Sequence, residues 1–126
     1  MIDPERLRIQ LSLSRTDFVL NVDLSLAIDG ITVLFVPSGS GKTTLLRCVA
    51  GLEKAIGVVS LGESTWQDSS RRRFKPTWQR ELGYVFQEAS LFEHLSVAGN
   101  LEYGLRRVPE ADRRFPLQRA IALLGI

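Results

Sequence analysis

The chain has 126 residues, of which 44% are apolar and 24% charged, a composition typical of a folded domain with one small core. Its net charge of +2 and its pI of about 9.0 are mildly basic and say little about partners. A single cysteine, Cys48, excludes an internal disulfide, and no apolar run reaches the length of a membrane span.

Strand patterns open the chain. Polar and apolar residues alternate over Arg6–Leu13 and again over Phe18–Leu26, which is the period of a half-buried strand. Asp29–Gly30 predicts a turn into a third strand, the apolar run Ile31–Val36. Three successive strands before the first helix predict an antiparallel sheet that flanks a parallel one.

The segment after the third predicted strand has the composition of a phosphate-binding loop. Backbone N–H groups of a glycine-rich turn and of a helix N-terminus bind phosphate oxygens. Lys42 would reach the outer phosphates of a nucleotide, and the Thr43 hydroxyl would coordinate Mg²⁺. The following helix is expected to run to Ala50, with Gly51 as its C-terminal cap. The phosphate-binding residues are therefore predicted to be Val36, Pro37, Ser38, Gly39, Ser40, Gly41, Lys42, Thr43 and Thr44.

The first position of this loop departs from the usual pattern. The sequence G-x-x-x-x-G-K-[ST] has glycine where this chain has Val36. If the site needs a left-handed backbone there, valine would cost roughly 1–2 kcal/mol, or about tenfold or more in affinity. If the local backbone is ordinary β, the cost is small. Both interpretations stay open, and the first predicts that Val36→Gly tightens nucleotide binding while Lys42→Ala abolishes it.

Short elements follow the first helix. Gly57–Leu61 is expected to form a strand, and the pattern then breaks into a polar, basic loop between Gln67 and Gln79. Leu82–Phe86 predicts a compact apolar strand that ends at Gln87. Trp66 and Trp78 are expected to pack the small sheet, and Cys48 to be buried.

The last third of the chain has helical patterns. Ser96 is expected to cap a helix that runs to Leu105, and a second amphipathic helix is expected over Asp112–Leu124. Apolar periodicity continues to the last residues, 123–126, so we expect the sequence to be the N-terminal portion of a longer protein. Residues 1–6 lack the features of a secretion signal, which predicts a cytoplasmic location.

Two further features have competing interpretations. The basic run at 71–75 fits a nucleic-acid patch, but the surrounding charges nearly balance, so a solvated loop is favoured and no nucleic-acid partner is expected. His94 has no cysteine or second histidine for a metal site, and a surface position is favoured.

The motifs together resemble the ATP-binding subunits of ABC transporters. Residues 38–47 resemble the phosphate loop and helix of that family, 82–88 its Q-loop, and 91–101 the segment that meets a transmembrane partner. Residues 29–35, 99–104 and 123–126 are most similar to the branch of the family that imports molybdate. The resemblance covers essentially the whole chain.

This resemblance implies the fold class and the domain organisation. It implies an α/β P-loop NTPase core of the ABC ATPase type with an antiparallel β-subdomain and the start of a helical subdomain, truncated. Residues 1–90 would form the β-subdomain and the P-loop core, and residues 91–126 the start of the helical subdomain, within one ABC ATP-binding domain.

The resemblance also implies the function and its residues. The cofactors would be ATP and Mg²⁺, with Lys42 and Gln87 as the catalytic residues and Thr43 and Gln87 at the metal. Phe18 is the residue that could stack on adenine, although a strand-core role is equally open. The partners would be a transmembrane permease subunit and a second ATP-binding subunit, at the cytoplasmic face of the inner membrane, for uptake of a small oxyanion such as molybdate.

Several parts of the family pattern are missing from these 126 residues. There is no Leu-Ser-Gly-Gly-Gln-like signature, no apolar strand that ends in Asp-Glu and no later switch histidine. Because phosphoryl transfer depends on positioned charges, we expect this chain alone to bind nucleotide weakly and scarcely to hydrolyse it. The alternative is a non-catalytic interaction module, or inactive fragment, that keeps only the permease-facing surface; a P-loop kinase or GTPase fits Gln87 less well.

Overall fold

The structure is a computed structural model that describes residues 3–37, 39 and 41–126. The chain divides into two compact units, residues 1–84 and residues 85–126. Among the described residues, no helix has both the length and the apolar character needed to cross a bilayer.

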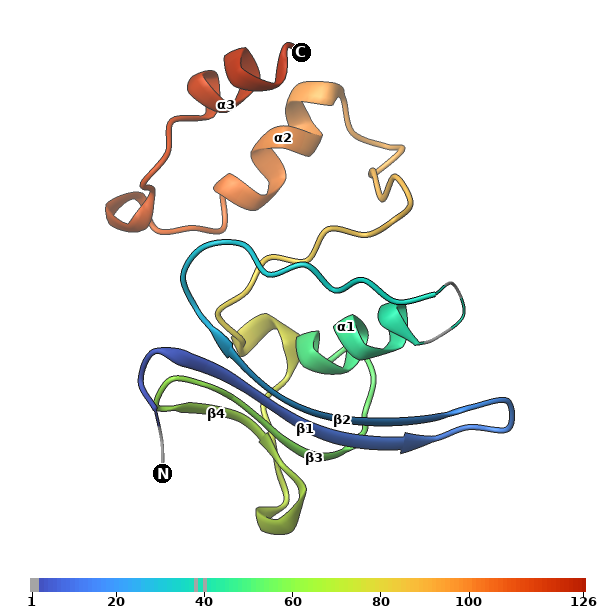
Figure 1. Cartoon of the computed structure of the whole chain (residues 1–126). Helices are drawn as coiled ribbons and strands as arrows, with labels where there is room; N and C mark the ends of the chain where they lie inside the picture. Colours follow the sequence, from blue (N-terminus) through green and yellow to red (C-terminus); the bar gives the residue numbers. More distant parts are fainter. Residues whose placement is uncertain (1–2, 38, 40) are drawn as a thin grey trace. The chain divides into compact units, whose positions relative to one another are not determined.

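The first unit is built on a five-stranded antiparallel sheet with the order β2-β1-β3-β4-β5 (Figure 1). Every apolar side chain from Leu7 to Leu13 falls on one face of β1, because side chains alternate between faces along a strand. The predicted strands near the N-terminus and after the first helix are confirmed. The strands are β1 (Arg6–Ser14), β2 (Val19–Ala27), β3 (Ile56–Leu61), β4 (Ser64–Asp68) and β5 (Arg73–Phe74).

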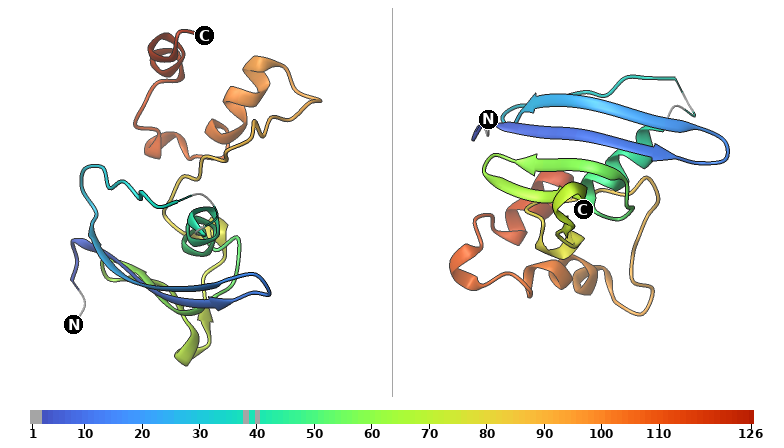
Figure 2. Two further views of the ribbon diagram at one scale, coloured as in Figure 1. Left: turned by 45° about the vertical axis from the view of Figure 1, so that its right-hand side comes forward. Right: turned by 90° about the horizontal axis from the view of Figure 1, so that it is seen from below.

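Helix α1 (Lys42–Ala50) covers one face of this sheet, as the left-hand view of Figure 2 shows. Leu45 and Cys48 belong to the core with buried side chains of the sheet such as Ile9 and Val59. Cys48 is fully buried, as predicted, and Gly51 caps the helix in a left-handed conformation. The contact with the sheet fixes the helix that begins at the predicted phosphate loop.

Two predicted strands are wrong. Ile31–Val36 and Leu82–Phe86 are both irregular, and neither belongs to the five-stranded sheet. The side chains of Ile31 and Phe35 are each 94% exposed. A strand requires a neighbour for its backbone N–H and C=O groups, and an apolar run does not supply one.

The expected loop between Gln67 and Gln79 is also corrected. Gln67 is the buried fourth residue of β4, and the segment contains β5 and two 3₁₀ turns, Ser69–Arg71 and Thr77–Gln79. Trp66 packs the sheet as predicted. Trp78 does not, because it lies on the second 3₁₀ turn with its side chain 84% exposed.

The second unit contains helix α2 (Val97–Leu105), a 3₁₀ turn (Glu110–Asp112) and helix α3 (Leu117–Leu124). Ser96 caps α2 as predicted, since its hydroxyl accepts a hydrogen bond from the Gly99 N–H at 3.0 Å. The second helix begins later than predicted. Pro116 disfavours helical backbone at the residue before it and stands at the cap of α3.

Candidate functional site

The glycines of the predicted phosphate loop have the backbone that the motif requires. Gly39 has φ +82° and Gly41 φ +88°, a conformation in which a side chain is strained. Gly41 is the N-cap of α1 and offers no side-chain acceptor to the first-turn N–H groups. Ser38 and Ser40 of the prediction lie outside the described residues. The described part of the loop therefore opens onto a helix N-terminus suited to an anion.

Lys42 and Val36 are in direct contact across the loop. The Lys42 ammonium donates a hydrogen bond to the Val36 carbonyl oxygen at 3.1 Å. Among the described residues other than glycine, only Arg72 has a positive φ, so the Val36 backbone is outside the left-handed region. The strain interpretation of Val36 is thus wrong, and valine fits this position without that cost.

The side chain of Val36 does not lie apart from the loop. It is half-buried and lines a cavity of about 310 Å³ together with Gly41, Lys42 and side chains of β2. Pro37 and Thr43 are exposed, and Thr44 is half-buried one step along α1. A flexible ammonium, glycine amides and an exposed hydroxyl are the donor set that a nucleotide triphosphate and its Mg²⁺ require, so the described residues fit both groups.

Phe18 lies beside this loop. It is half-buried just before β2, and a Cβ atom built on Gly41 would stand 3.3 Å from its ring. With Thr44, Phe18 lines a surface cavity of about 410 Å³ on the flank of α1. Arg15 and Arg47 on the same cavity both form ion pairs with Glu53. Phe18 therefore packs against the core and also borders the loop, so both interpretations of this residue remain.

Gln87 belongs to the second unit. It is exposed in a bend outside any helix or strand. The structure brings Val36, Gly41, Lys42 and Phe18 together, and the role of Gln87 stays a prediction.

The sequence did not predict the network of hydrogen bonds that the Asn100 side chain makes. The Asn100 side-chain oxygen accepts from the Phe92 N–H at 2.8 Å, and its amide group donates to the Phe92 carbonyl at 3.1 Å and the Ser96 carbonyl at 3.0 Å. Phe92 also packs on the Tyr103 ring, with centroids 4.3 Å apart. The loop before α2 is thereby held in one shape. Leu91 on this loop and Val97 at the start of α2 have exposed side chains, at 70% and 76%.

The two features with competing interpretations are both on the surface. Arg71 is exposed and pairs with Asp68, whose carboxylate accepts from Ser70; that hydrogen bond lowers the pKa of Asp68. The solvated-loop interpretation is consistent with this exposure. His94 is exposed beside Phe92, and no metal-binding group of acidic, histidine or cysteine side chains occurs in the part of the chain that the structure describes.

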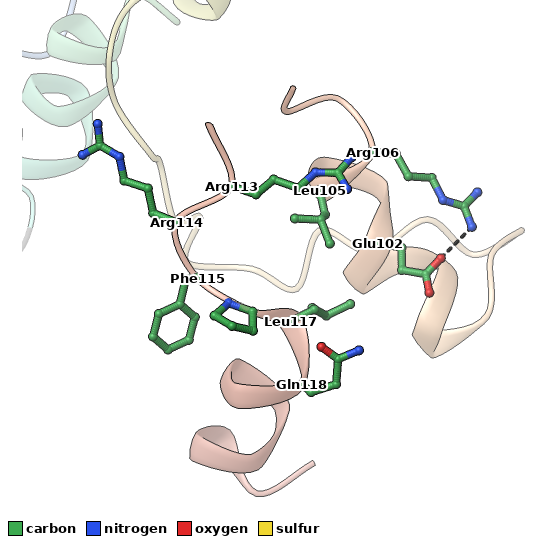
Figure 3. Close-up of a pocket in the computed structure, with 9 residues that line it drawn as sticks. Glu102, Leu105, Arg106, Arg113, Arg114, Phe115, Leu117 and Gln118 are labelled. Atoms are coloured by element: carbon green, nitrogen blue, oxygen red, sulfur yellow. Dashed lines mark hydrogen bonds and ion pairs between the residues drawn. The ribbon is translucent and has the colours of Figure 1, made fainter. Parts of the chain in front are cut away.

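The second unit has a cavity of about 470 Å³ between α2 and α3 (Figure 3). Arg106 pairs with Glu102 at 2.6 Å, and the Arg113 Nε donates to the Val108 carbonyl at 3.0 Å. These arginines and Arg114 are exposed, so the cavity is a solvated surface groove.

Comparison with known proteins agrees with this geometry. Residues 19–126 match the ABC transporter family. The chain is 58% identical over 123 residues to the molybdenum import ATP-binding protein ModC of Aromatoleum aromaticum, covering 97% of this chain and 33% of that protein. It is 54% identical over 121 residues to ModC of Pseudomonas fluorescens, covering 95% and 34%, and 52% identical over 121 residues to ModC of Pseudomonas aeruginosa, covering 95% and 34%.

The chain spans about a third of the length of the curated relatives it matches. The family match covers most of the chain and includes the loop, helix α1 and the whole second unit. The fold class predicted from the sequence, a P-loop NTPase fold of the ABC type with an antiparallel sheet, is confirmed. The chain belongs to the ABC transporter family.

Proposed function

We propose that residues 36–44 bind the triphosphate of ATP together with Mg²⁺, as part of the ATP-binding subunit of an importer. The observation that carries this proposal is the Lys42–Val36 hydrogen bond at the start of α1. A phosphate oxygen is a stronger acceptor than a carbonyl, so it would replace Val36 as the partner of the ammonium group. Until a phosphate replaces it, the Val36 carbonyl holds the ammonium group of Lys42 at the loop.

Each residue has a defined part in this proposal. Lys42 holds the outer phosphates, and the Thr43 hydroxyl is a ligand of the metal. Gln87 would approach the metal and the attacking water. A bound Mg²⁺ would supply positive charge that neutralises the developing charge of the phosphates. Phe18 would stack on the base, because its ring borders the loop at Gly41.

The names of the relatives describe molybdenum import and ATP binding, which supports a proposal for the substrate and the partners of the intact protein. We propose that the intact protein hydrolyses ATP as a dimer of ATP-binding subunits, bound to a transmembrane permease at the cytoplasmic face of the inner membrane, and that the transported oxyanion is molybdate. The exposed Leu91, on the loop held by Asn100, and the exposed Val97, at the start of α2, offer an apolar surface suited to a permease. Within the ATP-binding domain, residues 1–90 would form the β-subdomain and the P-loop core, and residues 91–126 the start of the helical subdomain.

Binding of a fluorescent ATP analogue with Mg²⁺ tests the proposal. The chain should bind it, and Lys42→Ala should weaken binding by at least about tenfold, since hydrogen bonds to charged groups contribute roughly 1.5–3 kcal/mol. Lys54→Ala is the matched control, because Lys54 lies over the Phe74 ring and outside the loop. Equal, negligible binding by all three proteins would favour the non-catalytic interaction module.

A further inference from the structure

Arg80 is a buried arginine without a carboxylate partner in the described part of the chain. Its residue is 4% exposed, and its hydrogen bonds go to backbone carbonyls. Nε donates to the Lys75 carbonyl at 2.7 Å, and Nη1 donates to the carbonyls of Val49 at 2.8 Å and Cys48 at 3.3 Å. One guanidinium thus joins two segments that are about thirty residues apart in the sequence.

The Cys48 and Val49 carbonyls are at the C-terminal end of α1. The last carbonyls of a helix have no partner within it, and they carry the negative end of the helix dipole. Arg80 supplies both a donor and a positive charge at this end. Gly51 leaves the space that this requires, because a Cβ atom there would stand 2.7 Å from the Arg80 Cζ atom.

Aromatic rings hold the guanidinium from the sheet side. The Arg80 Cζ atom lies 4.8 Å from the centroid of Phe74 and 5.9 Å from that of Trp66. Lysine could not reproduce this arrangement, since its ammonium is a compact charge without a planar fork. Burial of a charge is costly, and apolar residues often pack as stably, so stability alone does not account for an arginine here.

We propose that Arg80 is a positioning residue that locks the C-terminal end of the phosphate-loop helix α1 to the segment Thr77–Arg80, the stretch of chain that continues to Gln87. Through this lock, a change at the phosphate loop is transmitted along α1 to the segment before Gln87. The inference rests on the proposed nucleotide site for its role, while the lock itself is a property of the nucleotide-free chain.

The labelling rate of the Cys48 thiol tests the lock in the absence of nucleotide. Cys48 is the only thiol in the sequence and it is fully buried beside the Arg80 contact, so its labelling measures opening of the end of α1. Arg80→Lys should speed labelling of the folded chain by about tenfold or more, beyond the rate calculated from its change in global unfolding. Arg8→Lys is the control, because Arg8 pairs with Asp23 on the exposed side of the sheet. Labelling no faster than global unfolding predicts would overturn the lock.

The ¹⁹F resonance of Trp78 tests whether a change at the phosphate loop reaches the segment Thr77–Arg80. Trp78 lies two residues before Arg80 with an exposed side chain, and its ¹⁹F resonance in 5-fluorotryptophan-labelled chain should separate from that of buried Trp66. The Mg²⁺ complex of an ATP analogue should shift the Trp78 line in the wild-type chain. In Arg80→Lys the analogue should still bind, but the Trp78 line should not move. A merely structural role predicts instead that the line moves as in the wild type, and that result would overturn the inference.

The two proposals fail in different ways. If the wild-type chain binds no analogue, the proposed function fails, and transmission from that site fails with it; Cys48 labelling still decides whether the lock exists. If Arg80→Lys does not fold, Gly51→Ala replaces it, since the added Cβ displaces the guanidinium but keeps the arginine. Gly125→Ala is its control, because Gly125 also caps the C-terminal end of a helix with a positive φ, but a Cβ atom there meets nothing within 4 Å. Unchanged labelling in Gly51→Ala would contradict the lock.

Discussion

The Lys42 ammonium donates to the carbonyl of Val36 at 3.1 Å, so a hydrogen bond joins the first and seventh residues of the phosphate loop. The contact uses the backbone of Val36, not its side chain, and the backbone there is outside the left-handed region. Any residue with ordinary backbone could provide this carbonyl. The missing glycine is therefore no obstacle to the loop.

Val36→Gly should not tighten nucleotide binding. The change should leave the dissociation constant of an ATP analogue within about twofold, because there is no left-handed strain to relieve. It should lower the free energy of unfolding by about 1–2 kcal/mol, because it removes a half-buried side chain and because glycine raises the conformational entropy of the unfolded chain. Titration and urea unfolding measure the two effects. Val33→Gly, at a 78% exposed side chain, is the control; tenfold tightening in Val36→Gly alone would restore the strain interpretation.

Phe18→Leu should distinguish the contribution of the base to ATP binding from that of the phosphates. If Phe18 stacks on adenine, the variant should weaken ATP binding by about tenfold, the loss of roughly 1.4 kcal/mol of stacking. Binding of inorganic triphosphate should not change, because it has no base. Competition titrations with both ligands compare the two. Equal losses for ATP and triphosphate would instead assign Phe18 to the strand core and the packing of Gly41.

Asn100→Leu should release the loop before α2. The variant removes the acceptor of the Phe92 N–H and the amide group that donates to the carbonyls of Phe92 and Ser96, and leucine replaces neither. Amide exchange at Phe92 should speed up by about tenfold or more. Ser96→Ala is the matched variant. It should speed up amide exchange at Gly99, whose N–H donates to the Ser96 hydroxyl, and leave amide exchange at Phe92 slow. An unchanged Phe92 rate in Asn100→Leu would show that the ring contact with Tyr103 holds the loop.

Cys48 should make stability depend on alkaline pH. Burial raises the pKa of its thiol, against the opposing effect of Arg15, Arg47 and Arg80. The stabilisation is fully present below the pKa of the unfolded thiol, about 8.5, and is lost as the pH rises through the folded value. Urea unfolding at pH 7 and pH 10 should show a larger fall for the wild type than for Cys48→Ala. Equal falls would mean that the thiol does not stay protonated in the fold.

Local rules predicted the elements whose cause is local. The period-two pattern gave β1 and β2, and Ser96 and Gly51 marked their helix ends, because caps and alternation depend on neighbours in the chain. Ile31–Val36 failed because an apolar run cannot show whether a partner strand is present.

Two groups of long side-chain contacts were beyond sequence reasoning for a related reason. Arg80 reaches carbonyls about thirty residues away, and Asn100 reaches Phe92 across a loop. No spacing rule connects such pairs. The loop glycines and Lys42 could be predicted because their chemistry is contained in one short motif.

The most direct measurement of the central claim is an ¹⁵N NMR titration of the folded chain with Mg²⁺ and a non-hydrolysable ATP analogue. If backbone amides and Lys42 hold the triphosphate, the largest shifts should occur at the amides of Gly39, Gly41, Lys42 and Thr43, and Lys42→Ala should remove them. Shifts centred outside these residues, or none in a chain that circular dichroism shows to be folded, would contradict a nucleotide site at the start of α1.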